Sequence, residues 1–129
     1  RCGTGHSVSF VGNVHEGPHA LNGRNTTLMR PGMIVTDEPG VYETDLVGIR
    51  IENELVCVHK ADNQYGTFLG FEPIMFVPIA TSPIVPGVLT KDELDWLNNY
   101  HRQVFEKLAP RLNDEEREWL AKKCAAIGC

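Results

Sequence analysis

Residues 36–56 read TDEPGVYETDLVGIRIENELV, and this acidic stretch decides the fold. Its middle, GIRIEN, alternates apolar and charged residues, which is the period of a β-strand, because side chains two positions apart share a face. The pattern predicts a strand in which Ile49 and Ile51 pack behind the sheet. Arg50 and Glu52 then share the opposite face, which is either a solvated edge or the wall of a metal site.

The composition indicates one folded domain of ordinary size. The chain has 129 residues, of which 42% are hydrophobic and 22% charged, so we expect a packed core. The net charge is −5 and no long basic run occurs, which argues against nucleic acid as a partner. No segment approaches the ~18 consecutive apolar residues of a membrane span, so we expect no membrane association.

The cysteines favour a reducing compartment. The chain has four, none in the CxxC spacing of a zinc or redox site, and they do not form a disulfide-scaffold pattern. We therefore expect a cytoplasmic protein, with Cys57 as a buried thiol in an apolar strand. The chain begins with Arg1 rather than methionine, and we expect it to be part of a longer protein.

The fold class predicted from the chain is α+β, with strands in the first half. Residues 6–18 lean toward β structure, and turns are predicted at 31–32 and 39–40, where proline precedes glycine. The best strand covers residues 48–60. Proline-bearing residues 74–79 are predicted as an edge strand or an irregular one.

The second half is predicted to be helical. Thr90 begins a capping box, so a helix should start at residue 91 and end near Pro110. Asn113 is the predicted cap of a second helix, whose first turn carries three acids that suit the helix dipole. Trp96 and Trp119 are expected in the core of these helices.

The candidate functional residues are His6, His15, Glu38 and Glu52, with Arg50 beside them. Imidazole and carboxylate groups bind hard or borderline divalent cations, and the proline after Glu38 restrains its backbone. Taken singly, each has a simpler interpretation: a lone histidine is a surface or core residue, DEPG is a turn, and the arginine–glutamate pair is a weak surface ion pair. We expect one imidazole and two distant carboxylates to converge when the chain folds.

The order and spacing of three motifs resemble a known family. GTGHSVSFVGNVHEGPH, PGMIVTDEPGVY and GIRIENELV are similar to the second half of the pita-bread (creatinase/aminopeptidase-like) metallopeptidases. LTKDELDWLNNYHRQV resembles the C-terminal extension of the long-form X-prolyl aminopeptidases (aminopeptidase P). The resemblance implies an antiparallel sheet plus C-terminal helices, with residues 1–80 as the C-terminal half of a catalytic domain and residues 81–129 as a helical extension.

The resemblance also implies a site with two divalent metal ions, manganese by preference and zinc or cobalt as alternatives. His6, Glu38 and Glu52 match metal ligands, and Glu52 matches the one that bridges both ions. Glu38 also matches the group that accepts and passes a proton. His15 matches a histidine that contacts the substrate and assists the tetrahedral intermediate, and Arg50 matches a partner of the carboxylate cluster.

Two aspartate ligands of the family are expected upstream of the first motif, so this polypeptide alone should be inactive. Cys2 falls where some relatives carry an active-site histidine, and we assign it no role. The implied function is hydrolysis of the peptide bond before proline by a cytoplasmic homodimer acting on proline-containing peptides. The alternatives are an X-Pro dipeptidase, a metal-free amidinohydrolase, and a metal-free pita-bread module that binds peptides or proteins.

Overall fold

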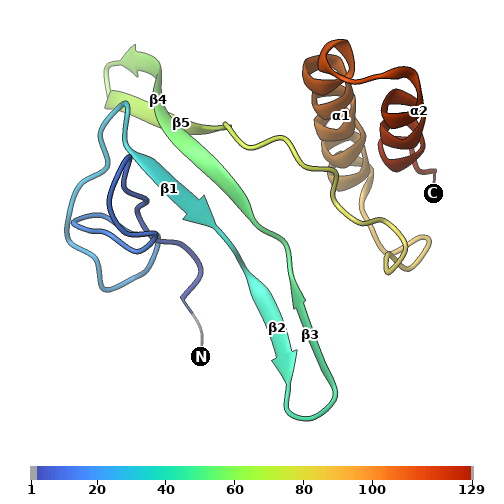
Figure 1. Cartoon of the computed structure of the whole chain (residues 1–129). Helices are drawn as coiled ribbons and strands as arrows, with labels where there is room; N and C mark the ends of the chain where they lie inside the picture. Colours follow the sequence, from blue (N-terminus) through green and yellow to red (C-terminus); the bar gives the residue numbers. More distant parts are fainter. Residues whose placement is uncertain (1–2, 129) are drawn as a thin grey trace. The chain divides into compact units, whose positions relative to one another are not determined.

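The computed structural model describes residues 3–128, so the predictions made for Arg1 and Cys2 lie outside the described residues. The chain divides into two compact units, residues 1–75 and 76–129. The first is built of strands and the second of helices, which confirms the α+β class (Figure 1). The predicted functional boundary after residue 80 stays a prediction. Among the described residues no helix is both long and apolar enough to cross a bilayer.

The first unit contains an antiparallel sheet and a two-stranded ribbon (Figure 1). In the sheet, β4 (Asn53–Asn63) lies between β1 (Ile34–Asp37) and β5 (Gly66–Pro73), and a two-residue turn joins β4 to β5. The ribbon pairs β2 (Gly40–Glu43) with β3 (Val47–Arg50). β5 is therefore an edge strand. Residues 74–79 form no strand, so the edge or irregular strand predicted there is wrong, and Pro78 lacks the N–H that a strand ladder needs.

The predicted single strand over residues 48–60 is two strands, because β3 ends at Arg50 and β4 begins at Asn53. The turn predicted at Pro39 is also wrong, since β1 leads almost directly into β2 (Figure 1). The interruption of the paired strands has a local cause. Proline has no N–H, so Pro39 cannot donate a hydrogen bond to the chain opposite it. At this position the two chain segments are joined by the Ile51 N–H, which donates to the Pro39 carbonyl at 3.2 Å.

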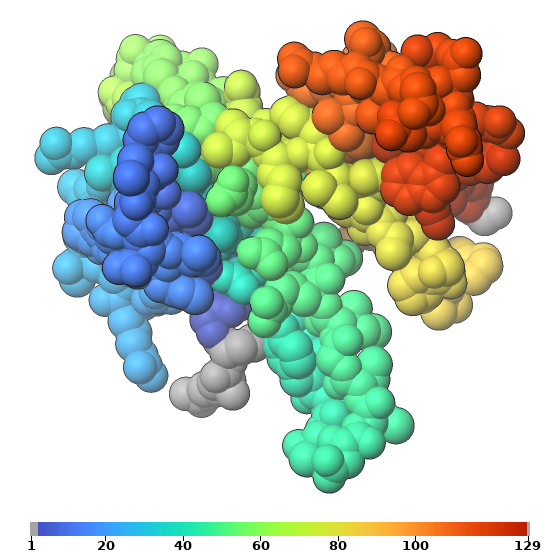
Figure 2. Space-filling model, viewed as in Figure 1, coloured from blue at the N-terminus to red at the C-terminus, as the bar shows by residue number. Residues whose placement is uncertain are grey.

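The ribbon of β2 and β3 carries apolar side chains that face solvent. Ile49 is 50% exposed and Ile51 is 52% exposed, so the prediction that they pack behind the strand is wrong. Two strands alone offer no second layer for them to pack against. Figure 2 shows the ribbon, in teal and green, as a narrow projection from the rest of the first unit.

The stretch before β1 forms less β structure than predicted. Over residues 6–18 only Ser7 makes a bridge, to Val35. Backbone bonds extend this contact along β1, because the Thr36 N–H donates to the His6 carbonyl and the Glu38 N–H to the Thr4 carbonyl, both at 2.8 Å. Residues 4–7 thus lie antiparallel along the free edge of β1.

The helices of the second unit begin at the predicted caps. Before α1 (Lys91–Leu108), Thr90 forms a complete capping box with Glu93. Before α2 (Asp114–Lys123), Asn113 does the same with Glu116. A short 3-10 turn, η1 (Ala109–Arg111), follows α1 at the predicted proline.

The core of the second unit lies between α1 and α2. Tyr100, Val104 and Leu120 are its buried members. Trp96 is 60% exposed and Trp119 is 56% exposed, so the prediction that these two tryptophans are core is wrong. Both tryptophans lie on the solvent-facing sides of their helices. Other apolar residues packed against the core are Phe76, Ile79, Phe105, Leu108, Leu112 and Cys124.

Two side chains of α1 hold residues 76–79 against the helix. The Tyr100 hydroxyl donates to the Val77 carbonyl at 2.9 Å. The Ile79 N–H donates to Nε2 of His101 at 3.1 Å, and this histidine is fully buried. The irregular segment after β5 is therefore fixed by specific hydrogen bonds as well as by apolar contact.

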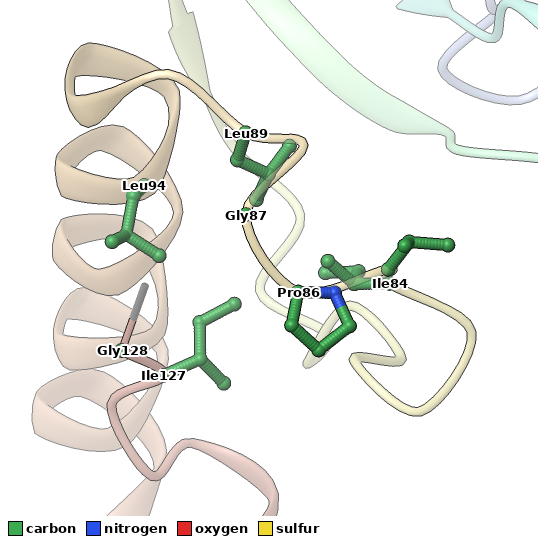
Figure 3. Close-up of a pocket in the computed structure, with 8 residues that line it drawn as sticks. Ile84, Pro86, Gly87, Leu89, Leu94, Ile127 and Gly128 are labelled. Carbon is green, nitrogen blue, oxygen red and sulfur yellow. The ribbon is translucent and has the colours of Figure 1, made fainter.

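The C-terminal segment of the second unit is fixed to α1 by a reciprocal pair of hydrogen bonds. The Asn98 amide donates to the Ile127 carbonyl and accepts from the Ile127 N–H, each at 3.0 Å. Beside this contact, Leu89, Leu94 and Ile127 surround a small apolar hollow (Figure 3). Its lining consists of apolar side chains and glycine, so it offers no group for chemistry.

Candidate metal centre

The two glutamates predicted as metal ligands lie opposite one another in the short breaks between the strands, Glu38 between β1 and β2 and Glu52 between β3 and β4. Asp37 of β1 is paired with Asn53 of β4 just before the break, and β2 pairs with β3 in the same register after it. Continuing that register through the break sets Glu38 opposite Glu52. Directly opposed residues of an antiparallel pair point to the same face, so the two carboxylates share a face.

Arg50 lies between these two carboxylates. Its Nη1 is 3.5 Å from Oε2 of Glu38 and 4.0 Å from Oε2 of Glu52. Like charges directly opposite each other destabilise a sheet, and the guanidinium offsets that repulsion. The Arg50 Nε donates to the Tyr42 hydroxyl at 2.8 Å, and this contact raises the pKa of Arg50 above its ordinary value. The arginine therefore carries its charge at every working pH.

His6 reaches the same cluster from the segment alongside β1. Its Nε2 is 3.0 Å from Oε1 of Glu38. Gly5 makes this approach possible, because a Cβ at that position would lie 2.3 Å from the Thr36 carbonyl oxygen. The second glycine of GTGH is thus required by the close passage of two backbones, while a Cβ on Gly3 would meet nothing within 4 Å.

His15 stands next to His6 although nine residues separate them. The two ring centroids are 4.0 Å apart, with the rings inclined at 38°. The loop is folded back by the Glu16 N–H, which donates to the Ser7 carbonyl at 3.3 Å. His15 is exposed, so its ring can meet a molecule from solvent. The structure therefore brings the five candidate residues into one connected cluster, and their individual roles stay predictions.

Two polar residues of this cluster were missed from the sequence. Thr36 is only 3% exposed, and its hydroxyl donates to Oε1 of Glu38 at 3.1 Å. A signal for it was present, because residues two apart on a strand share a face. Tyr42 had no such signal, since its contact with Arg50 depends on the register of β2 and β3.

The donors suit part of a metal site. An imidazole nitrogen and two carboxylate oxygens are ligands for borderline and hard divalent cations. Among residues 3–128, however, no three histidine, cysteine, aspartate or glutamate side chains are grouped closely enough to hold an ion. His6, Glu38 and Glu52 therefore suit the predicted metal ions chemically, but the described residues do not form a complete set of ligands.

Residues outside the cluster have simpler roles. Cys57 is buried in β4, as predicted. His19 bonds the Ile34 carbonyl through Nε2 at 2.7 Å, and His59 bonds Asp62 on the surface at 2.8 Å. Neither histidine contributes to the cluster of carboxylates.

Two family models match the chain along most of its length. The model of metallopeptidase family M24 matches residues 1–59, and the model of the C-terminal region of peptidase M24 matches residues 67–127. Aminopeptidase P2 of Arabidopsis thaliana is 46% identical over 93% of this chain and 18% of its own. A probable Xaa-Pro aminopeptidase P of Coprinopsis cinerea is 42% identical over 98% of this chain and 22% of its own.

The fold is also similar to that of a solved X-prolyl aminopeptidase. The X-prolyl aminopeptidase of Caenorhabditis elegans, a cytosolic enzyme with a di-nuclear active site, superposes with a TM-score of 0.84 at 39% identity. The match covers 97% of this chain and 21% of that one, and it confirms the predicted pita-bread fold. The chain spans about a fifth of the length of these relatives. It therefore belongs to metallopeptidase family M24, and among the members of that family it is similar to the X-prolyl aminopeptidases.

Proposed function

We propose that this chain is part of a dinuclear metal-dependent aminopeptidase that hydrolyses the peptide bond before proline. The observation that carries the proposal is the carboxylate pair Glu38 and Glu52, bridged by Arg50, with the His6 imidazole 3.0 Å from Glu38. The similarity to Xaa-Pro and X-prolyl aminopeptidases supports this assignment.

His6, Glu38 and Glu52 would hold part of a two-metal site. The remaining ligands in this proposal are two aspartates upstream of residue 1. Manganese is the preferred ion, with zinc or cobalt as alternatives. The sequence preceding Arg1 tests this directly, because two aspartates about eleven residues apart in a β-hairpin pattern are expected there.

When bound, two divalent cations act as Lewis acids that lower the pKa of water and polarise a carbonyl. The residues of this chain then move the proton and stabilise charge. Glu38 accepts the proton from the attacking water, since its carboxylate is held in place and largely buried. His15 donates a hydrogen bond to the carbonyl oxygen as negative charge develops on it.

Arg50 orients both carboxylates rather than touching the substrate. Its Nη1 contacts Glu38 and Glu52, and its Nε is held by Tyr42. A planar guanidinium with several fixed donors restrains two carboxylates better than a lysine ammonium would. Groups in this position tune metal affinity without binding the metal themselves.

The substrate class in this proposal is a peptide with proline as its second residue. The working form is a homodimer, and its compartment is the cytoplasm, as in the cytosolic relative. The same site would serve an X-Pro dipeptidase, so substrate length separates these functions. Activity on X-Pro-Y peptides longer than two residues supports the aminopeptidase, and activity on X-Pro alone supports the dipeptidase.

The test uses a longer protein that carries this chain together with its upstream aspartates. After chelation, added Mn²⁺ should restore cleavage of an X-Pro-Y peptide. Glu52→Gln should lower kcat/KM more than about 100-fold, because losing a ligand exceeds the 10–100-fold loss that follows removal of an outer partner. The matched control is Glu72→Gln, which removes only a surface ion pair with Lys60.

Full activity in Glu52→Gln would overturn the proposal. Tight peptide binding without bound metal or turnover would favour the metal-free binding module instead. The 129-residue chain by itself should cleave no X-Pro-Y peptide, because it lacks the aspartate ligands. Turnover by this chain alone would show that the ligand set has been assigned wrongly.

A further inference from the structure

Thr36 contacts two of the candidate metal ligands with one hydroxyl group. Its Oγ1 donates to Oε1 of Glu38 at 3.1 Å and accepts the backbone N–H of His6 at 3.0 Å. The hydroxyl has a single hydrogen, so its direction is fixed once Glu38 accepts it. The side chain is 3% exposed, and water therefore does not compete for these bonds.

The backbone of Thr36 strengthens the same connection. Its N–H donates to the His6 carbonyl at 2.8 Å, so His6 is bonded to Thr36 through both its N–H and its carbonyl. Thr36 lies in β1 opposite Glu54 of β4, inside the three-stranded sheet. The hydroxyl is therefore carried by a strand that pairs with β4 on one side and bonds to residues 4–7 on the other.

The contacts to Glu38 are divided between its two oxygens. Thr36 and His6 approach Oε1, while Arg50 approaches Oε2. A carboxylate with a fixed partner on each oxygen loses rotational freedom before any ligand binds, which lowers the entropy cost of binding. Thr36 approaches Glu38 with a hydroxyl group, and its burial keeps solvent from replacing that contact.

We propose that Thr36 is a positioning residue of this site, which fixes the carboxylate of Glu38 and the backbone of His6 in the arrangement that binds metal. The inference rests on the proposed function, because it assigns Thr36 to the metal site described above. It predicts that the hydroxyl, rather than the volume of the side chain, sets metal affinity.

The experiment replaces Thr36 in the longer protein that carries the upstream aspartates. Thr36→Val keeps the shape and removes the hydroxyl, whereas Thr36→Ser keeps the hydroxyl and removes a methyl group. Mn²⁺ affinity is measured by calorimetry on the metal-free protein, and the thermal midpoint without metal is recorded for each variant. The matched control is Thr67→Val, which removes a hydroxyl that donates to the Asp62 carboxylate at 2.7 Å on the β4–β5 hairpin.

Thr36→Val should weaken Mn²⁺ binding about 10–100-fold, as loss of a ligand's hydrogen-bond partner does. Thr36→Ser should stay within about threefold of the parent, and Thr67→Val should match the parent. Unchanged Mn²⁺ affinity in Thr36→Val would overturn the inference. If Thr36→Val does not fold, Thr36→Ser decides the question, because a folded serine variant with a similar 10–100-fold loss would also overturn it.

The parent protein and the Thr36→Val variant together distinguish failure of this inference from failure of the proposed function. A parent protein that binds no Mn²⁺ and cleaves no X-Pro-Y peptide contradicts both. A parent protein that does both, with a Thr36→Val variant of equal affinity, contradicts only the role of Thr36.

Discussion

At the scale of single residues, Gly5 shows how one missing side chain shapes the candidate site. The segment that carries His6 passes so near β1 that a Cβ at position 5 would lie 2.3 Å from the Thr36 carbonyl oxygen and 2.8 Å from Cβ of Leu21. The first of these neighbours is backbone, which cannot rotate away. The position of His6 beside Glu38 therefore depends on glycine at this point.

Gly5→Ala should destabilise the longer protein by about 1–3 kcal/mol, the usual effect of forcing atoms into a packed site. It should also weaken Mn²⁺ binding, because His6 must move away from Glu38. The thermal midpoint and calorimetric affinity measure the two effects. Gly3→Ala is the matched control and should change neither, since a Cβ there meets nothing within 4 Å. Equal behaviour of the two variants would refute the close-approach explanation.

His101 is a second residue whose environment has a measurable consequence. It is fully buried on α1, and burial lowers its pKa below the ordinary value of 6.5. Because Nε2 accepts from the Ile79 N–H, the ring proton of the neutral form sits on Nδ1. That nitrogen is buried without a hydrogen-bond partner among the described residues.

The folded second unit should lose stability as the pH falls below about 6.5. In the unfolded chain His101 takes up a proton near that pH, while in the folded unit its lowered pKa delays protonation, so acid favours unfolding. His101→Gln offers an amide oxygen to Ile79 and should flatten this dependence. The urea midpoint of the 129-residue chain, followed by fluorescence of Trp96 and Trp119, measures it. Equal slopes for parent and variant between about pH 5 and 7 would contradict the prediction.

At the scale of elements, the helices are determined locally and the strands are not. α1 and α2 each begin at a complete capping box formed within four consecutive residues. The strand break at Pro39, by contrast, coincides with a break at Ile51 in the chain paired opposite it, whose N–H donates to the Pro39 carbonyl. Local chemistry therefore sets the ends of the helices, and pairing sets the ends of the strands.

Thr90→Ala should lower the stability of the second unit by about 1 kcal/mol, because α1 loses the oxygen that accepts the Glu93 N–H. Asn113→Ala should have a similar effect on α2. Thr90→Ser is the matched control and should be nearly neutral, since serine caps as well as threonine. Urea unfolding followed by tryptophan fluorescence measures all three. A serine variant as unstable as the alanine variant would show that the cap is not the cause.

At the scale of the whole molecule, the β2–β3 ribbon exposes several apolar side chains close together. Val41 and Ile49 are directly paired across it, and both face solvent. Leu46 and Val47 at its turn are exposed as well. Two-stranded ribbons are marginally stable alone, and apolar patches of this kind favour association.

The 129-residue chain should therefore self-associate, and Val41→Thr with Ile49→Thr should reduce that association. Threonine keeps the β-branched shape and strand propensity while removing apolar surface. Sedimentation velocity over a range of concentrations measures the effect. The control pair, Val85→Thr with Val88→Thr, removes exposed apolar surface from the second unit and should leave association unchanged. A monomeric parent chain, or an equal effect of both pairs, would refute the role of the ribbon.

The sequence by itself determined the features that depend on neighbouring residues. The α+β class, the capping box at Thr90, the cap at Asn113, the turn at Pro31 and the buried Cys57 follow from local pattern, and the structure confirms each of them. The motifs also sufficed for the family, because each combines a candidate ligand with a specific glycine, proline or arginine. Roles within the site could be inferred only through resemblance.

Tertiary structure alone decided which residues meet. The register of two strand pairs sets Glu38 opposite Glu52 and brings Tyr42 to Arg50, and no local pattern specifies that register. The same applies to Ile49 and Ile51, whose alternation suggested a buried face that the two-stranded ribbon does not provide. Periodicity fixes which side chains share a face, but burial depends on what covers that face, and that is a property of the assembled fold.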